Sequence, residues 1–424
     1  MKRTLTSIVA ASAAVALLAG CAGGTKASTG SSGGGGGSQT LTLASVDQGS
    51  IEPVVKAFEA ANPGVKVEYT TSAADQYQQQ IRTQLASGTA PDVMSVWPGN
   101  GNPGATYVLA KPGYLMDLSD QPWASQYPDA LKTVTQYQGK TYNAVYGLNA
   151  IGAIYNEQAL AKSKLTPPAT WSQVLPFCQA AAKQGTPAFA LGIQDNWVTQ
   201  LVLYSLVAST LYPSDPDFDT KMAAGQATFS GSAWEAALDK YQQMDKAGCF
   251  QKNTLGTSYE ASQTLAATGK TLGLVQGNWV VALLKKKDPK ATFTFKPLPA
   301  LDDPAKILIP AAAGAGYGIN AKTKNKDLAL KFISFVMSPA GMKLFVEAQG
   351  GIPALPGSGA TVDPTLKDVS TYISDNRTVP FMDQLWPNPK VQQTMLSGLQ
   401  EIFSGQSTGA KMFKAMDKDY EAGE

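Results

Sequence analysis

The chain has 424 residues, 44% of them hydrophobic, and its 34 basic residues nearly balance its 32 acidic ones. That length is too great for one compact core and suggests two lobes, whereas the near-neutral charge gives no support to nucleic-acid binding. The absence of histidine excludes Ser-His-Asp and Cys-His catalysis, and metal sites built on imidazole. Two carboxylates would still suffice for glycoside hydrolysis, so a glycosidase stays open as an alternative.

The first residues are typical of an exported lipoprotein. A basic start, Met1-Lys2-Arg3, precedes the apolar residues 8–19, which are too few to span a bilayer and match a signal-peptide core. The motif Leu18-Ala19-Gly20-Cys21 then resembles the bacterial lipobox, in which lipid is attached to the cysteine and the chain is cut before it. We therefore expect a lipoprotein signal peptide over 1–20 and lipidation of Cys21; an ordinary secretory signal is the alternative.

Residues 22–38 have the composition of a flexible tether. They contain no large apolar side chain, so they cannot bury enough surface to offset the entropy of ordering. A Gly/Ser chain of this length has an end-to-end distance of roughly 20–25 Å. The segment is interpreted as a leash that holds a soluble domain near a membrane, or, because of its five consecutive glycines, as an engineered linker.

The first part of the domain alternates between strand and helix patterns. Apolar and polar residues alternate in the strands, apolar residues recur every three or four positions in the helices, and Gly88 is placed to end the second helix. Strand-helix-strand-helix-strand in so short a length predicts a parallel, doubly wound sheet. The predicted elements are strands at 41–45, 65–69 and 91–97, a helix capped by Ser50 and stopped at 62–64, and a helix at 75–87.

Two loops of this sheet are candidate ligand positions. Ligands of doubly wound sheets lie beyond the carboxyl ends of the strands. The loops that leave those ends are Val46–Gly49 after the first strand and Trp97–Asn100 after the third.

The middle of the chain, about 150–310, is predicted to be rich in helices with short strands between them. Helices are expected from about Trp171 to Gly185 and around Trp234, and a strand at 271–280 runs into a polar turn with a glycine. Residues 293–300 and 314–320 are predicted to be strands or their ends. The helical pattern resumes at Lys326.

Two cysteines remain besides Cys21. In an exported protein, Cys178 and Cys249 are more often paired than free, and a loop of about 70 residues would gain on the order of 4 kcal/mol from closure. We expect a disulfide; two separate buried thiols are the alternative.

Five segments together make the chain from Cys21 onward resemble the extracellular solute-binding proteins of sugar ABC importers, the maltose-binding-protein-like family 1. Lys164 stands where that family commonly has glycine, and residues 271–274 replace its usual Ala-Ala-Met core. The segments are FEAANPGVKVEY (58–69), ASGTAPDVMSVW (86–97), AIYNEQALAKSKLTPPATW (153–171), AATGKTLGLVQGNWV (266–280) and NKDLALKFISFVMSPAGMKLF (325–345).

The resemblance implies a two-lobed periplasmic-binding-protein fold of class α/β. Each lobe would be a mostly parallel sheet flanked by helices, with crossovers near 148–151, near 318–321 and after 352–353. Three glycines at the second crossover would absorb the dihedral changes of a hinge. The implied lobes are 39–148 with 320–353 and 149–319 with 354–424, and the hinge glycines are Gly314, Gly316 and Gly318.

The resemblance also implies a sugar in the cleft between the lobes, held by aromatic planes and by polar side chains that bind hydroxyl groups. Three other tryptophans, Trp123, Trp171 and Trp234, are expected to be structural. Turn or cap roles are the alternative for the polar residues. The implied ligand-binding residues are Asp47, Gln48, Trp97, Asn149, Asp195, Asn196, Trp197, Asn278, Trp279, Tyr317 and Trp386.

The function that follows is that of a lipid-anchored receptor outside the cytoplasm. It would bind a sugar or oligosaccharide as a monomer and deliver it to the membrane permease of an ABC transporter. We expect no catalysis, no cofactor, no metal, no nucleic-acid partner, and contact with the membrane only through the lipid. The alternatives are a receptor of the same fold for a non-sugar solute and a lipid-anchored glycosidase.

Overall fold

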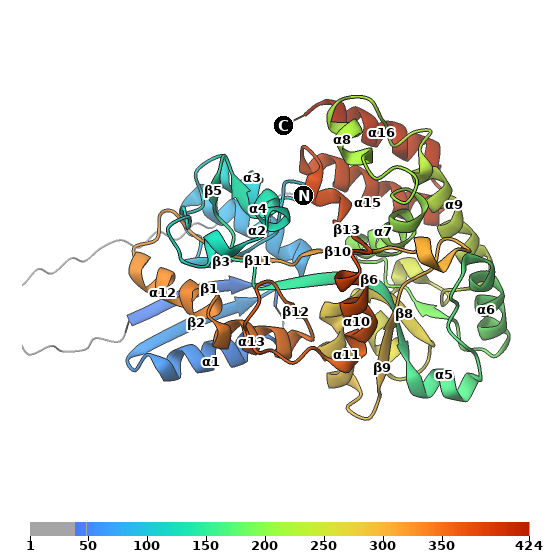
Figure 1. Ribbon diagram of the computed structural model, residues 1–424, viewed down its shortest axis with the longest axis horizontal. Coiled ribbons are helices and arrows are strands. Elements are labelled where there is room, and N and C mark those ends of the chain that lie inside the picture. Colours follow the sequence, from blue (N-terminus) through green and yellow to red (C-terminus); the bar gives the residue numbers. More distant parts are fainter. Residues whose placement is uncertain (1–38, 48, 424) are drawn as a thin grey trace, which may run out of the picture. The chain divides into compact units, whose positions relative to one another are not determined.

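The computed structural model describes residues 39–47 and 49–423, which fold around two separate main β-sheets with helices packed on them (Figure 1). This two-lobed α/β architecture confirms the predicted fold class. The predictions for the signal peptide, the lipidated Cys21, the tether and Gln48 lie outside the described residues.

The first sheet has the strand order β11-β3-β1-β2. The three strands predicted from the start of the domain pair in parallel, and the fourth, from far along the chain, runs antiparallel beside β3. The strands are β1 (Gln39–Ser45), β2 (Val65–Thr71), β3 (Val93–Val96) and β11 (Gly316–Ile319).

The helices of the first lobe bury the apolar faces that their spacing predicted. In the first helix, Ile51, Val54, Val55 and Phe58 are buried, and the Phe58 ring meets that of Phe332 edge-on at 5.1 Å between centroids. The Ser50 side chain makes no cap hydrogen bond, which corrects that expectation. The helices are α1 (Ile51–Ala61), α2 (Ala74–Ser87), α3 (Thr106–Ala110), α4 (Asp129–Thr135), α12 (Lys326–Val336) and α13 (Pro339–Gln349).

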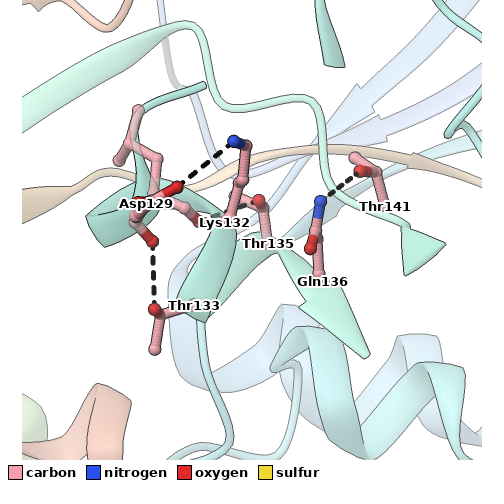
Figure 2. Close-up of polar contacts among 7 residues, drawn as sticks. Asp129, Lys132, Thr133, Thr135, Gln136 and Thr141 are labelled. Carbon is pink, nitrogen blue, oxygen red and sulfur yellow. Dashed lines mark hydrogen bonds and ion pairs between the residues drawn. The ribbon is translucent and has the colours of Figure 1, made fainter. Parts of the chain in front are cut away.

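A small hairpin of strands β4 (Gln136–Tyr137) and β5 (Lys140–Thr141) follows α4 directly. Figure 2 shows how side chains secure this junction: the Thr133 and Thr135 hydroxyls donate to main-chain carbonyls one turn earlier, and Gln136 donates to the Thr141 hydroxyl at 3.2 Å. Lys132 pairs with Asp129 at 3.2 Å.

The second sheet is built around β6 (Gly147–Asn156), which runs antiparallel to four partners. It is therefore mixed rather than mostly parallel, because every strand that pairs with β6 runs in the opposite direction to it. Only β13 with β10 and β7 with β8 pair in parallel. The strands are β7 (Phe189–Ala190), β8 (Gly273–Gly277), β9 (Phe293–Lys296), β10 (Ile309–Ala313), β12 (Ile352–Pro353) and β13 (Thr378–Val379).

The second lobe carries most of the helices. Its central helix, α7, carries apolar side chains on every side and is almost wholly buried, as a helix enclosed by other elements must be. The helices are α5 (Glu157–Ser163), α6 (Trp171–Lys183), α7 (Thr199–Thr210), α8 (Phe218–Ala223), α9 (Ala233–Lys246), α10 (Tyr259–Ala267), α11 (Val281–Lys287), α14 (Lys367–Ser374), α15 (Pro389–Phe403) and α16 (Gly409–Glu421).

The second of the three crossovers lies earlier in the chain than expected. Because β10 belongs to the second sheet and β11 to the first, the chain crosses at residues 314–315, and 316–319 belongs to the first lobe. The boundary at 319/320 is corrected accordingly. Ile352 of β12 packs against the second lobe, Ala354 and Leu355 pack in the first core, and Val362 packs against the second lobe again.

The glycines of the second crossover serve close packing rather than unusual dihedral angles. None of Gly314, Gly316 and Gly318 has a positive φ. A Cβ on Gly316 would lie 2.4 Å from the Ala144 carbonyl oxygen, and one on Gly318 would lie 2.9 Å from Val96. Their backbone angles therefore give no sign of a hinge. Their small size lets neighbouring strands touch.

A disulfide joins Cys178 in α6 to Cys249 just after α9, which agrees with the pairing that the sequence favoured. Both residues are fully buried in the core of the second lobe. The bond closes a loop of 71 residues, so it restricts the unfolded chain substantially.

Among residues 39–47 and 49–423, no single helix is long and apolar enough to cross a membrane. One pair of helices bent by 66°, α12 with α13, meets that test only by combined length and composition.

Replacing both cysteines, Cys178→Ala with Cys249→Ala, should lower the free energy of unfolding by about 2–4 kcal/mol, because the unfolded chain regains the entropy of an open loop. Chemical denaturation with and without reductant measures this. The wild type should lose stability on reduction and the double variant should not respond. Two free thiols in unfolded, unreduced Cys21→Ala protein would contradict the pairing.

Candidate binding site

A cavity of about 1360 Å³ is lined by residues of both lobes. Its lining includes the residues that follow the carboxyl ends of β1 and β3, the start of β6, and loops of the second lobe. Its volume exceeds that of most pockets for drug-sized ligands. The sequence-predicted site residues that line it are Asp47, Trp97, Asn149, Asp195, Asn196, Trp197 and Trp279.

The three lining tryptophans are half-buried, and each is supported from behind. Trp97 rests against Tyr77, at 5.7 Å between ring centroids, and Trp197 meets Tyr259 at 4.8 Å. Trp279 folds back over its own chain: a Cβ on Gly277 would lie 1.9 Å from the indole. Gly277 therefore makes room for this ring.

Asp47 is a buried carboxylate held by several donors. The Tyr317 hydroxyl donates to its Oδ2 at 2.5 Å, and Gln349 at the end of α13 donates to Oδ1 at 3.2 Å. Burial raises its pKa above the ordinary value, although the hydrogen bonds from Tyr317 and its other neighbours oppose that shift. These contacts fix the carboxylate at the cavity wall, where it can accept a hydrogen bond from a hydroxyl group.

The polar residues of the second lobe are placed by short-range contacts. Asp195 accepts a hydrogen bond at 2.6 Å from the Tyr259 amide at the start of α10. Its neighbour Asn196 begins a short 3-10 turn that also carries Trp197. Across the cavity, burial raises the pKa of Asp75 in α2, and the charge of Asp195 raises it further. The charge of Asp195 in the second lobe therefore acts on Asp75 of the first lobe.

Three predicted residues do not line the cavity. Asn278 is fully buried: its Oδ1 accepts from the Ala150 amide at 2.8 Å and its Nδ2 donates to the Gly350 carbonyl at 3.2 Å. Tyr317 lies one layer behind Asp47. Trp386 is buried in the second core, with its ring 5.4 Å from that of Phe229. Asn278 and Trp386 are thus packed away from the cavity in this structure, and Tyr317 reaches it through Asp47.

Trp123 and Trp234 are buried as expected, and Trp171 lies under the Lys240 ammonium at 4.1 Å from its ring centroid. These rings pack the lobes, as the sequence predicted.

Sequence reasoning missed a second polar group in the lining. Gln392 in α15 donates to Asp383 Oδ2 at 3.0 Å and to Gln200 at 3.1 Å, and all three residues face the cavity with Tyr259. The resemblance implies Trp386 as a ligand-binding residue, but the turn points Trp386 into the core and Asp383 toward the cavity. That orientation depends on the packing of the 3-10 turn, which no local pattern encodes.

Burial also governs the ionisation of Asp383. Removal from water raises its pKa from the ordinary 3.8 to about 6. Between these values the folded chain holds a proton that the unfolded chain has lost, so the free energy of unfolding falls as the pH rises through this window. Over the whole window the free energy of unfolding falls by about 3 kcal/mol.

Asp383→Asn should therefore raise the free energy of unfolding at neutral pH, by up to about 3 kcal/mol, because it removes the buried charge and keeps an acceptor for Gln392. The gain should shrink at about pH 4, where the wild-type carboxyl is already neutral. Denaturant unfolding at both pH values measures it.

Asp302→Asn is the control, for which we expect the opposite change in the free energy of unfolding. The Ser172 amide donates to Asp302 at 2.7 Å and holds the pKa of that exposed carboxyl below its ordinary value. This variant should lose stability, and lose more at neutral than at acid pH. A gain from Asp383→Asn that does not change with pH would contradict the assignment.

Among the residues that the structure describes, no group of three or more histidine, cysteine, aspartate or glutamate side chains is arranged to hold a metal ion.

Residues 54–371 match the family model described as bacterial extracellular solute-binding protein. Because that match covers well over half of the sequence, the chain belongs to the bacterial extracellular solute-binding protein family. It is accordingly a binding protein and not an enzyme.

Similar proteins agree with this assignment. The chain is 24% identical over 353 residues to the "Multiple sugar-binding protein" of Streptococcus mutans, covering 80% of this chain and 79% of that one. It is 25% identical over 324 residues to the "Maltooligosaccharide ABC transporter solute-binding lipoprotein" of Streptococcus pneumoniae, covering 73% and 71%. The solved structure of a "Chitin oligosaccharide binding protein" superposes with a TM-score of 0.76 at 22% identity, covering 88% and 94%, and shares its fold.

Proposed function

We propose that this protein is the lipid-anchored substrate-binding component of an ABC transporter, which binds a sugar or oligosaccharide between its lobes and delivers it to a membrane permease. The observation that carries the proposal is the lining of one cavity by three supported tryptophans and several aspartate and asparagine side chains. Relatives named as sugar-binding proteins of ABC transporters support it.

The chemistry of the lining suits a sugar. Its apolar C–H faces would stack on Trp97, Trp197 and Trp279, which contribute affinity by removing apolar surface from water. Its hydroxyls would bind Asp47, Asn149 and Asp195 with Asn196. An unmatched buried polar group costs about 1–3 kcal/mol, so these residues would provide specificity. Gln48 stays in the proposed set on the resemblance alone.

Binding would act by shifting the equilibrium between lobe arrangements. A sugar that contacts residues of both lobes binds the closed arrangement more tightly than the open one, and it shifts the population toward closure by that difference in affinity. The closed form would then dock on the permease. A receptor of the same fold for a non-sugar solute is the second candidate, because the cavity also presents Arg82 and Lys286.

A thermal-shift screen against mono- and oligosaccharides tests the proposal directly. Labelled oligosaccharides that raise the melting temperature should be recovered uncleaved after prolonged incubation. A rise with organic acids or amines alone would favour the non-sugar receptor, and cleaved products would contradict a binding protein.

Trp279→Ala should weaken binding of the oligosaccharide found in that screen at least tenfold, because truncating a buried aromatic anchor often costs 2 kcal/mol or more. Calorimetric titration measures the affinity and a melting curve measures stability.

Trp234→Ala is the matched control, since that ring is buried in the second core and its loss should cost about 3–5 kcal/mol of stability. If Trp279→Ala binds normally but melts early, Trp279 is a packing residue and the proposed placement of the sugar is wrong.

Cys21→Ala should release the protein from membranes without changing its affinity for sugar, since the lipid would attach at this residue and the tether separates it from the cavity. Fractionation of cells followed by titration of the released protein measures both. Membrane attachment that persists in this variant would contradict lipidation at Cys21.

A further inference from the structure

The two lobes touch through main chain at a place where no peptide bond joins them. The turn Gly99–Gly101, after β3 in the first lobe, lies against Asp383–Pro387 of the second. A Cβ on Gly101 would lie 1.8 Å from the Asp383 carbonyl oxygen, and one on Gly99 would lie 2.0 Å from that of Gln384. The contact is closer than any side chain would permit, so it exists because both residues are glycine.

Hydrogen bonds join the same two segments. The Asn100 amide donates to the Gln384 carbonyl at 3.3 Å, and the Asn100 side-chain Nδ2 donates to the Pro387 carbonyl. Asn100 is buried by this arrangement. We call Gly99–Gly101 together with Asp383–Pro387 the interlobe clasp.

The first-lobe half of the clasp is rigidly mounted. The Gly99 amide donates to the Val134 carbonyl of α4 at 2.7 Å, and the Gly99 carbonyl accepts from the Tyr107 amide at 3.1 Å. The contacts in Figure 2 secure α4 and the hairpin that follows it. The turn therefore moves with the first lobe.

The second-lobe half is anchored on both sides. Met382 and Trp386 are buried in the second core, Asp383 accepts from Gln392 of α15, and the Gln384 side chain donates to the Ala313 carbonyl at 2.9 Å. In contrast, Leu385 between them packs against the first core. One short 3-10 turn, Met382–Leu385, thus binds to both lobes.

We propose that the interlobe clasp is a non-covalent connection that holds the lobes in the arrangement of this structure and must separate or slide when they move apart. Its energy adds to the stability of this arrangement even without ligand, so it sets the equilibrium that any ligand must shift. The proposal does not depend on which solute is bound, and it goes beyond the proposed function.

This role has a consequence for affinity. If only part of the population has the binding-competent arrangement, the apparent dissociation constant rises by the inverse of that fraction. Weakening the clasp should thus change the apparent affinity, although Gly101 itself is absent from the cavity lining and only its contact Asp383 belongs to it.

Gly101→Ala provides the test. Gly101 has no positive φ, and the three atoms nearest to a Cβ there all belong to Asp383 across the clasp. Gly99 is unsuitable because its φ is +73°. In the unliganded, purified full-length protein, amide exchange of peptides covering 99–101 and 383–387 should rise at least tenfold, and the radius of gyration should increase. Peptides from α1 and α7 should be unchanged.

Gly351→Ala is the matched control, because a Cβ there would lie no closer than 3.8 Å to any other group. It should leave exchange and scattering as in the wild type. Asn100→Ala is a second variant that creates no collision and removes the bond to Pro387, and it should change exchange in the same direction by a smaller factor.

Wild-type exchange and scattering in both Gly101→Ala and Asn100→Ala would overturn the proposal. A general loss of stability in Gly101→Ala, together with wild-type exchange of the peptides covering 99–101 and 383–387 in Asn100→Ala, would also overturn it. The contact would then be ordinary packing. Both measurements are made without ligand, so a failure of the clasp is distinguishable from a failure of sugar binding.

Discussion

The pairing of β6 with the other crossover segments is the constraint on which the rest of the structure depends. Leu148 and Gly147, where β6 begins, pair on one side with β12 and lie close to the β10–β11 crossover on the other. The chain passes between the lobes at neighbouring positions that hydrogen-bond to one another. The cavity lies beside this junction, with Asn149 and Gly314 in its lining.

The aromatic lining depends on small residues and on second rings. Trp279 requires the missing side chain of Gly277, and Trp97 lies against Gly104, where a Cβ would be 2.9 Å from the indole. Tyr259 supports Trp197 from behind and anchors Asp195 through its amide. A flat apolar face is therefore presented in a set orientation, which lowers the entropic cost of ordering a binding surface when a ligand arrives.

The charged lining is organised for binding rather than for chemistry. Asp47 is held by Tyr317 and Gln349, and Asp383 by Gln392, so their oxygens are oriented by neutral donors. Burial raises the pKa of both carboxyls, which places a titration near pH 6 in the wall of the cavity at Asp383. Asp383 also belongs to the interlobe clasp, so the ionisable carboxyl in the cavity wall lies next to the contact between the lobes.

The sequence by itself determined the fold class and the three parallel strands and first two helices of the first lobe; it also favoured the pairing of Cys178 with Cys249 and placed seven of the residues that line the cavity. Hydrophobic periodicity and the position of a residue at a strand end are local properties, and they suffice for these features. Only the tertiary structure decided that Trp386 and Asn278 are packed away from the cavity, that 316–319 joins the first sheet, and that Gln392 reaches the cavity. The reason is that the direction of a side chain in a short turn, and the sheet that a short strand joins, depend on packing against residues distant in sequence.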